Sequence, residues 1–286
     1  MKPTTQDTTT RPEALATTSA TADLYLDLLK RALTRDLCQD LYAEVPPNTS
    51  TFKKAVRYRA YAAVLKVLRP MNLSLVQTTR PTGETMIGMG HMNNLHHCLE
   101  RVIAERVPGD VIETGVWRGG ATIFMRAFLQ VHRDPRNVWV ADSFEGLPKP
   151  DDKKYPQDKG DALWSQSYLA VSEEQVKANF RKYHMLDSQV KFLKGFFSDT
   201  LPAAPIGALA LMRLDGDMYE STIVALRSLY PKLSPGGFVI VDDFGMIPAC
   251  DQAVHDFRKE AGVTEDLQTI GYVRGNPLGA FWQRNA

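Results

Sequence analysis

The chain has 286 residues, of which 44% are hydrophobic and 23% are charged, and its formal net charge is +1. These values are typical of a globular protein with a sizeable core, and they argue against nucleic acid or an anionic membrane as a partner recruited by bulk charge. The three cysteines are widely spaced and form no CxxC pair, which disfavours a disulfide framework and a zinc site. We find no signal peptide and no apolar run that could span a bilayer, and therefore expect a cytoplasmic protein.

The N-terminal part of the chain predicts a tail followed by helices. Residues 1–20 are rich in Thr, Ala and Pro and predict a disordered tail. The spacing of apolar residues predicts helices over 22–41, 52–68 and 92–105. We therefore expect residues 21–107 to form a helical extension that serves as a lid or as an oligomer surface.

From about residue 108 to residue 286, strands and helices alternate, which is typical of an α/β domain with a parallel sheet. The expected strands are 110–113, 138–141, 190–193, 209–214 and 238–241, followed by a closing hairpin of 267–272 and 279–283. The expected helices are 121–131, 172–184, 221–233 and 251–261. A capping box at Ser172 opens the second of these helices, a long polar loop covers 145–165, and 234–237 is expected to be a turn.

Two aspartate clusters follow two of the expected strands. Asp215 and Asp217 follow the strand 209–214, and Asp242 and Asp243 follow the strand 238–241. Because the carboxyl ends of parallel strands meet at one edge of a sheet, these acids are expected to converge and to repel one another unless a cation lies between them. A hard divalent cation with oxygen ligands is the simplest solution. Taken singly, either cluster could instead be a solvated turn or a helix cap.

Ligation of a metal ion by Asp215, Asp242 and Asp243 would leave Asp217 free. A carboxylate two residues from a metal ligand can act as a general base on a hydroxyl. The metal ion would make that hydroxyl more acidic, as bound metals do for water. Asp217 is therefore the candidate catalytic base.

A glycine turn follows the first expected strand, in the sequence Glu113-Thr114-Gly115-Val116-Trp117-Arg118-Gly119-Gly120. The pattern ExGxxxGG departs from the dinucleotide fingerprint GxGxxG but leaves room for a cofactor beside Gly115. Asp142 ends the next strand, where an acid can bind ribose hydroxyls, and Ser198 lies where an adenine edge is expected. The alternative is a tight turn without a ligand, with Asp142 as its cap.

As a set, these residues resemble the macrocin O-methyltransferase (TylF/MycF) family of sugar methyltransferases from antibiotic pathways. The resemblance covers about residues 70–284. The matching stretches are Thr85-Met86-Ile87-Gly88, Glu113 to Gly120, Ala141 to Pro148, Val176 to Phe180, Gly195 to Pro202, Leu214 to Thr222 and Val241-Asp242-Asp243. The segments 88–91 and 251–255 depart from the family pattern, so the resemblance does not identify the sugar.

The resemblance implies a Rossmann-like class I methyltransferase sheet with helices on both faces, behind the N-terminal helical extension. It implies S-adenosylmethionine and Mg²⁺ as cofactors, a glycosylated small molecule as the substrate and a homo-oligomer, but no nucleic acid or membrane partner. The implied metal ligands are Asp215, Asp242 and Asp243, and the implied base is Asp217. The implied cofactor contacts are Met86, Ile87, Glu113, Gly115, Asp142, Ser143, Ser198 and Asp215.

Three other functions remain open from the residues. The same acids would serve a metal-dependent catechol or phenol O-methyltransferase, which only a screen of substrates separates from a sugar methyltransferase. A nicotinamide-dependent oxidoreductase is disfavoured by the missing GxGxxG pattern. A non-catalytic protein that binds a cofactor or uses the helical extension for assembly is disfavoured by the intact acid clusters.

Overall fold

The computed structural model describes residues 12–37, 42–44, 79–81, 83–273 and 275–285. The first helix, α1 (Pro12–Leu33), begins inside the segment for which the sequence predicts a disordered tail. It ends earlier than the predicted 22–41, because a turn with Arg35 at a φ of 60° follows it. The short strands β1 (Tyr42–Glu44) and β2 (Thr79–Pro81) pair antiparallel. The helix predicted over 52–68 lies outside the described residues.

A mixed seven-stranded sheet forms the centre of the molecule, in the order β5-β4-β3-β6-β7-β11-β8. Its parallel strands are β3 (Asp110–Thr114), β4 (Val138–Asp142), β5 (Val190–Lys194), β6 (Leu209–Leu214) and β7 (Leu233–Val241). The strand β11 (Ala280–Gln283) runs antiparallel between β7 and β8 (Gln268–Thr269), which confirms the predicted closing hairpin. Near its tip, β9 (Tyr272–Val273) and β10 (Asn276–Pro277) form a separate two-stranded ladder.

The turn predicted over 234–237 is wrong, because these residues lie within β7. The strand pairs with β6 at Leu233 and again from Phe238, and the register shifts between the two positions. Pro235 has no N–H to give to a ladder, and Gly236 adopts a φ of 81°, so the segment bulges between its paired ends. The sequence pattern identified only the regular half of the strand.

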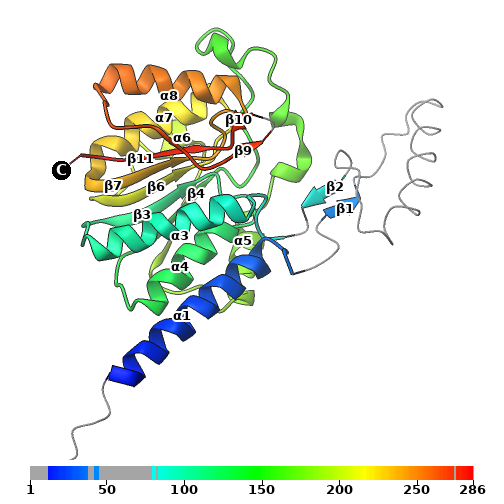
Figure 1. Cartoon of the computed structure of the whole chain (residues 1–286). Coiled ribbons are helices and arrows are strands. Elements are labelled where there is room, and N and C mark those ends of the chain that lie inside the picture. The colour runs from blue at the N-terminus through cyan, green and yellow to red at the C-terminus, as the bar shows by residue number, and fades with distance from the viewer. Residues whose placement is uncertain (1–11, 38–41, 45–78, 82, 274, 286) are drawn as a thin grey trace, which may run out of the picture.

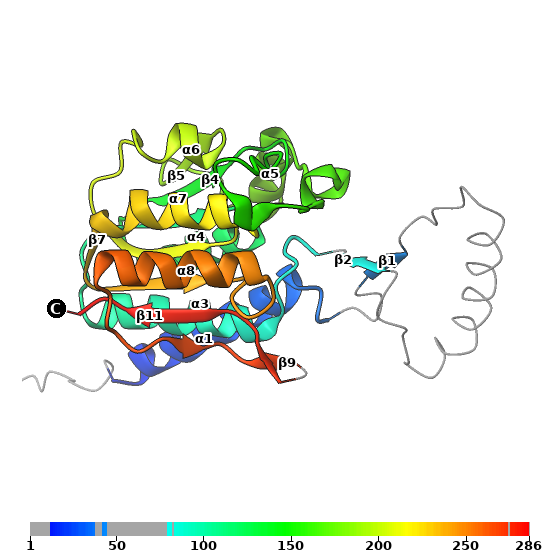
Figure 2. The ribbon, with the colours of Figure 1, turned by 90° about the horizontal axis from the view of Figure 1, so that it is seen from above.

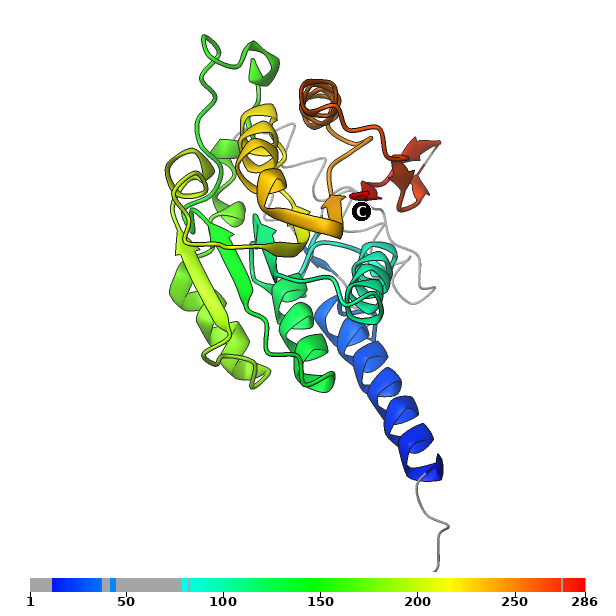
Figure 3. The same cartoon turned by 90° about the vertical axis from the view of Figure 1, so that its left-hand side faces the viewer.

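Helices cover both faces of the sheet, as predicted (Figures 1 and 3). One face packs against α1, α3 (Met89–Ala104), α4 (Gly120–Val131) and α5 (Glu173–Lys182). The other packs against α6 (Phe197–Thr200), α7 (Tyr219–Leu229) and α8 (Pro248–Ala261), and seen from above α7 and α8 run side by side (Figure 2). Alternate strand residues separate the two cores: Val111 and Leu211 face the α4 side, and Ile112 and Met212 face the α7 side. None of the described helices is long and apolar enough to cross a membrane.

The loop predicted over 145–165 links β4 to α5 and contains three short 3₁₀ turns, Pro156–Asp158, Leu163–Ser165 and Ser167–Leu169. Half of the predicted capping box is confirmed, because the Ser172 hydroxyl accepts a hydrogen bond from the backbone N–H of Gln175. The other half is wrong, since the Gln175 side chain donates to Asn179 instead of returning to Ser172.

Backbone hydrogen bonds bring the carboxyl ends of the central strands to one edge of the sheet. The N–H groups of Gly115, Asp215 and Asp242 donate to carbonyl oxygens at the carboxyl ends of the neighbouring strands β4, β3 and β6. The residues that follow these strands are therefore held side by side, which is where parallel α/β sheets form their sites.

Candidate functional site

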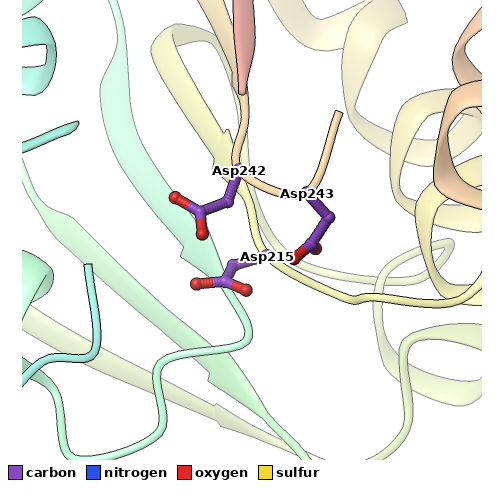
Figure 4. Close-up of side chains that lie close together, drawn as sticks. All are labelled: Asp215, Asp242 and Asp243. Carbon is purple, nitrogen blue, oxygen red and sulfur yellow. The ribbon is translucent and has the colours of Figure 1, made fainter. Parts of the chain in front are cut away.

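The two aspartate clusters converge at this edge of the sheet. Asp215 follows β6, while Asp242 and Asp243 follow β7, and one potential ligand atom from each lies within 4.8 Å of the others. Figure 4 shows the three carboxyl groups close together at the ends of the two strands. The backbone N–H of Asp217 donates to Asp243 over 2.9 Å and links the two clusters. The structure thus brings together the residues predicted to bind a metal ion.

Asp215 and Asp243 fit a cation site because their surroundings disfavour their charge. Burial raises the pKa values of Asp215 and Asp243 well above the ordinary value, and the neighbouring carboxylates raise them further. A divalent cation with oxygen ligands would remove both costs. The donor set therefore matches the hard cation that the sequence predicts.

Arg213, which the sequence analysis passed over, lies beneath the acid cluster. Its side chain is 1% exposed and occupies the face of β6 that α4 covers. The guanidinium donates to Glu113 over 2.5 Å, to Asp215 over 3.0 Å and to Asp242. A signal was present in the sequence, because an arginine inside a strand buried on both faces requires acidic partners.

Asp217 is the remaining acid of the cluster. Burial raises its pKa to about 6, and the charges of Asp242 and Asp161 contribute. Its backbone is left-handed, with a φ of 58°, which is uncommon for a residue with a side chain. An acid whose pKa lies near 6 is suited to accept a proton at neutral pH.

A pocket opens beside the acid cluster, with about 720 Å³ of empty space that includes part of the open solvent. Residues after β3, β4 and β6 line it, together with α6, the start of α7 and the loop after β4. Among the predicted site residues, those that line it are Met86, Gly115, Asp142, Ser143, Ser198, Asp215 and Asp217. Ile87 and Glu113 are 7% and 2% exposed and do not line it, because Ile87 belongs to the core and Glu113 faces Arg213.

The turn after β3 is held by Asp142. One oxygen of this carboxylate accepts hydrogen bonds from the N–H groups of Val116, over 2.8 Å, and Trp117, over 3.4 Å. The other oxygen accepts from the N–H of Phe144 over 2.7 Å. Asp142 is therefore a cap for two turns as well as a wall of the pocket, so the capping and binding interpretations of the sequence are compatible.

The segment that carries Met86 is fixed to the start of α4. The N–H of Gly120 donates to the carbonyl of Glu84 over 2.9 Å, and a Cβ at position 120 would lie 2.6 Å from that oxygen. The Glu84 carboxylate is itself paired with Lys182 of α5. Met86 is 42% exposed at the pocket wall, where a bound molecule would cover it.

The loop after β4 docks onto α7 through Asp158. This residue is 2% exposed, and its two carboxylate oxygens accept the backbone N–H groups of Tyr219, over 2.7 Å, and Glu220, over 2.9 Å. It caps a helix whose own N-cap residue, Met218, provides no side-chain hydrogen bond. Since Leu147 and Leu169 of the same loop line the pocket, this contact fixes one of its walls.

His91 of α3 lies beside the acid cluster. Its Nε2 is 3.5 Å from an oxygen of Asp242 and is buried without a hydrogen-bond partner among the described residues. Burial lowers the pKa of this imidazole, although the Asp242 charge opposes the shift. His91 does not line the pocket, so it contacts the cluster and not the space beside it.

Comparison with known proteins gives a consistent picture. The sequence profile of the family described as macrocin-O-methyltransferase (TylF) matches residues 22–284. The 8-demethyl-8-(2,3-dimethoxy-alpha-L-rhamnosyl)-tetracenomycin-C 4'-O-methyltransferase of Streptomyces olivaceus is 45% identical, over 92% of this chain and 94% of its own. The demethyldecarbamoylnovobiocin O-methyltransferase of Streptomyces niveus is 43% identical, over 95% and 97%. The mycinamicin III 3''-O-methyltransferase of Micromonospora griseorubida is 41% identical, over 94% and 99%.

Solved structures agree with the sequence relatives. The O-methyltransferase NovP superposes with a TM-score of 0.75 at 44% identity, covering 93% of this chain and 100% of its own. The calicheamicin methyltransferase CalS11 superposes with a TM-score of 0.53 at 20% identity, covering 99% and 98%, and shows the fold alone. The predicted fold class is confirmed.

Proposed function

Because this chain belongs to the macrocin O-methyltransferase (TylF) family and is an O-methyltransferase, we propose that it methylates a sugar hydroxyl of a glycosylated natural product. S-adenosylmethionine is the proposed methyl donor and Mg²⁺ the proposed metal ion. The observation that carries this proposal is the position of Asp215 and Asp217, which belong to the acid cluster and also line the pocket. A cation and an organic cofactor would then lie on either side of the same pocket wall.

The residues that would hold each group follow from this arrangement. Asp215, Asp242 and Asp243 would hold the cation. Gly115, Asp142, Ser143, Ser198 and Met86, which line the pocket, would surround the cofactor, and Asp142 and Ser143 would supply its polar contacts. When bound, the cofactor supplies the methyl group, and the cation lowers the pKa of the acceptor hydroxyl.

The chain itself would provide alignment and a proton acceptor. Asp217 would take the hydroxyl proton at a carboxylate oxygen, because burial has raised its pKa to about 6. Its backbone bond to Asp243 keeps it beside the cluster. The loop after β4, docked by Asp158, would exclude water from the pocket. Alignment and fixed charge are expected to supply most of the acceleration.

The relatives support a glycosylated substrate. Their names refer to a rhamnosyl tetracenomycin, a novobiocin precursor and a mycinamicin. Two of these names give different positions, 4' and 3'', so a panel of acceptors must offer more than one hydroxyl. A catechol or phenol acceptor would use the same acids and belongs in the same panel.

The proposal is tested by calorimetric titration with S-adenosylhomocysteine, with and without Mg²⁺, followed by turnover on the panel of acceptors. The expected result is cofactor binding and Mg²⁺-dependent methylation of a sugar hydroxyl. If a catechol is the only acceptor that is methylated, the substrate is a phenol and not a sugar. Binding of NAD in place of S-adenosylhomocysteine would overturn the assignment of S-adenosylmethionine as the cofactor.

Three further parts of the proposal concern the whole protein. We propose that residues 21–107 contribute a lid at the segment that carries Met86, which lines the pocket wall, while α1 and α3 of this range pack in the core on one face of the sheet. We also propose a homo-oligomer, which the exposed Leu24 and Leu28 on α1 support, and light scattering on a sizing column tests it. A cytoplasmic location remains a prediction.

A further inference from the structure

We propose that Arg213 is a positioning residue that turns the carboxylates of Asp215 and Asp242 toward a shared divalent cation, with Glu113 as its counter-ion. The inference rests on the proposed function, since it concerns the cation of that site. It assigns Glu113 to the acid cluster and not to the cofactor pocket.

The geometry of the pair begins in the sheet. Glu113 and Arg213 are register partners on the adjacent parallel strands β3 and β6, and their side chains point to the same face. Glu113 and Arg213 are 2% and 1% exposed, and 2.5 Å separates Oε1 of the glutamate from a guanidinium nitrogen. Neither side chain can reach water, so neither can change partner without a large cost.

The guanidinium also contacts the aspartates that follow β6 and β7. The nitrogen that contacts Glu113 also donates to Oδ2 of Asp215 over 3.0 Å, and the second terminal nitrogen donates to Oδ1 of Asp242. One rigid planar group therefore fixes one oxygen of each carboxylate. The other oxygen of each, Oδ1 of Asp215 and Oδ2 of Asp242, accepts no hydrogen bond from the described residues and remains available to a ligand.

The arrangement also sets the charge of the cluster. Without Arg213, Asp215, Asp242 and Asp243 would repel one another at distances below 5 Å in a poorly solvated site. Burial raises the pKa of Glu113 to about 7, against the effect of Arg213, and in its ionised form Glu113 offsets the charge of Arg213, so that the pair orders the aspartates without neutralising them. The cluster keeps the negative charge that a divalent cation requires.

A titration of the full chain with Mn²⁺, with free Mn²⁺ measured by electron paramagnetic resonance, tests the proposal without any turnover. Arg213→Lys keeps the charge but loses the planar fork. It should weaken Mn²⁺ binding by roughly 10- to 100-fold, as substitutions of residues that orient metal ligands do. Asp243→Asn identifies the site, because it should abolish the same binding.

A matched control is available in Arg126. It is also a buried arginine, 5% exposed, and it pairs with Asp187 on α4's side of the sheet, away from the cluster. Arg126→Lys should leave Mn²⁺ affinity unchanged. Near-ultraviolet circular dichroism on every variant establishes that the fold is retained.

The double variant Glu113→Gln/Arg213→Gln separates positioning from a merely structural pair. It removes the charges of Glu113 and Arg213 together, so the net charge of the site stays the same while Asp215 and Asp242 lose their bonds to the guanidinium. Mn²⁺ binding as weak as in Arg213→Lys supports the proposal. If Arg213→Lys does not fold, the double variant by itself tests the positioning role. A wild-type affinity for Mn²⁺ in the folded double variant would overturn the positioning role of Arg213. No Mn²⁺ binding by the wild-type chain would overturn the metal part of the proposed function as well.

Discussion

The backbone carbonyl of Asp215 lies directly against Gly115, so that a Cβ at position 115 would be 1.6 Å from its oxygen. Gly115 also adopts a φ of 82°. The glycine is thus required by the protein's own chain, where β3 and β6 end together, before any ligand is considered. The turn and the first metal-binding candidate are fixed by the same contact.

Gly115→Ala is therefore expected to lower the free energy of unfolding by more than the roughly 1–2 kcal/mol that a left-handed residue with a side chain costs. Urea unfolding measures the change. Gly90→Ala is the control, because nothing lies within 4 Å of its added Cβ and alanine favours helices. It should leave stability unchanged or raise it by up to about 1 kcal/mol. Equal effects at the two positions would contradict the packing argument.

Asp217→Asn should lower kcat by about 10²- to 10⁴-fold, the usual contribution of a positioned general base. Cofactor binding and Mn²⁺ binding should persist, because the bond from residue 217 to Asp243 comes from the backbone. Steady-state kinetics and calorimetry measure both quantities. Asp266→Asn, at an exposed position, is the control. Turnover at the wild-type rate in Asp217→Asn would show that Asp217 is not the general base.

The pH dependence of kcat/KM should have an acid limb that arises from Asp217. Burial raises the pKa of this carboxyl to about 6, and a protonated base cannot accept a proton, so activity falls as pH decreases through that value. A bound cation lowers the pKa, which places the limb at or below about pH 6. Because Asp161 raises the pKa of Asp217, Asp161→Asn should move the limb to lower pH. An unchanged limb would mean that another group titrates.

Asp158→Ala should destabilise the protein by about 1 kcal/mol, because α7 loses its cap. The loop that lines the pocket loses its anchor in the same step, so KM for the acceptor should rise. Denaturant unfolding and kinetics test the two effects together. Asp152→Ala changes an exposed acid of the same loop and should alter neither. A stable variant with unchanged KM would show that the loop is held by other contacts.

Much of the fold follows from local patterns. The strand at 209–214 was predicted with the boundaries that β6 has, since a buried apolar run ended by acids has one simple interpretation. The convergence of Asp215, Asp242 and Asp243 followed from the rule that parallel strands end at one edge. The family assignment made from the motifs is confirmed by the family profile and the relatives.

The remainder depended on contacts between distant segments. Glu113 was expected beside the cofactor, but its position is decided by Arg213 on the neighbouring strand. Asp158 lies in a loop without periodicity, and nothing local indicates that it caps a helix 61 positions further along the chain. The strand start at Leu233 was missed because Pro and Gly normally indicate a turn.

The left-handed backbone of Asp217 has a consequence for how this protein can change. Trp117 and Phe144 also have positive φ, and all three follow strands that end at the same edge of the sheet. Glycine would relieve such a conformation, so Asp217→Gly should raise the unfolding midpoint while it abolishes turnover. A directed-evolution campaign that selects for thermal tolerance alone would thus favour the inactive variant Asp217→Gly. Only a screen that also scores methylation would retain the aspartate.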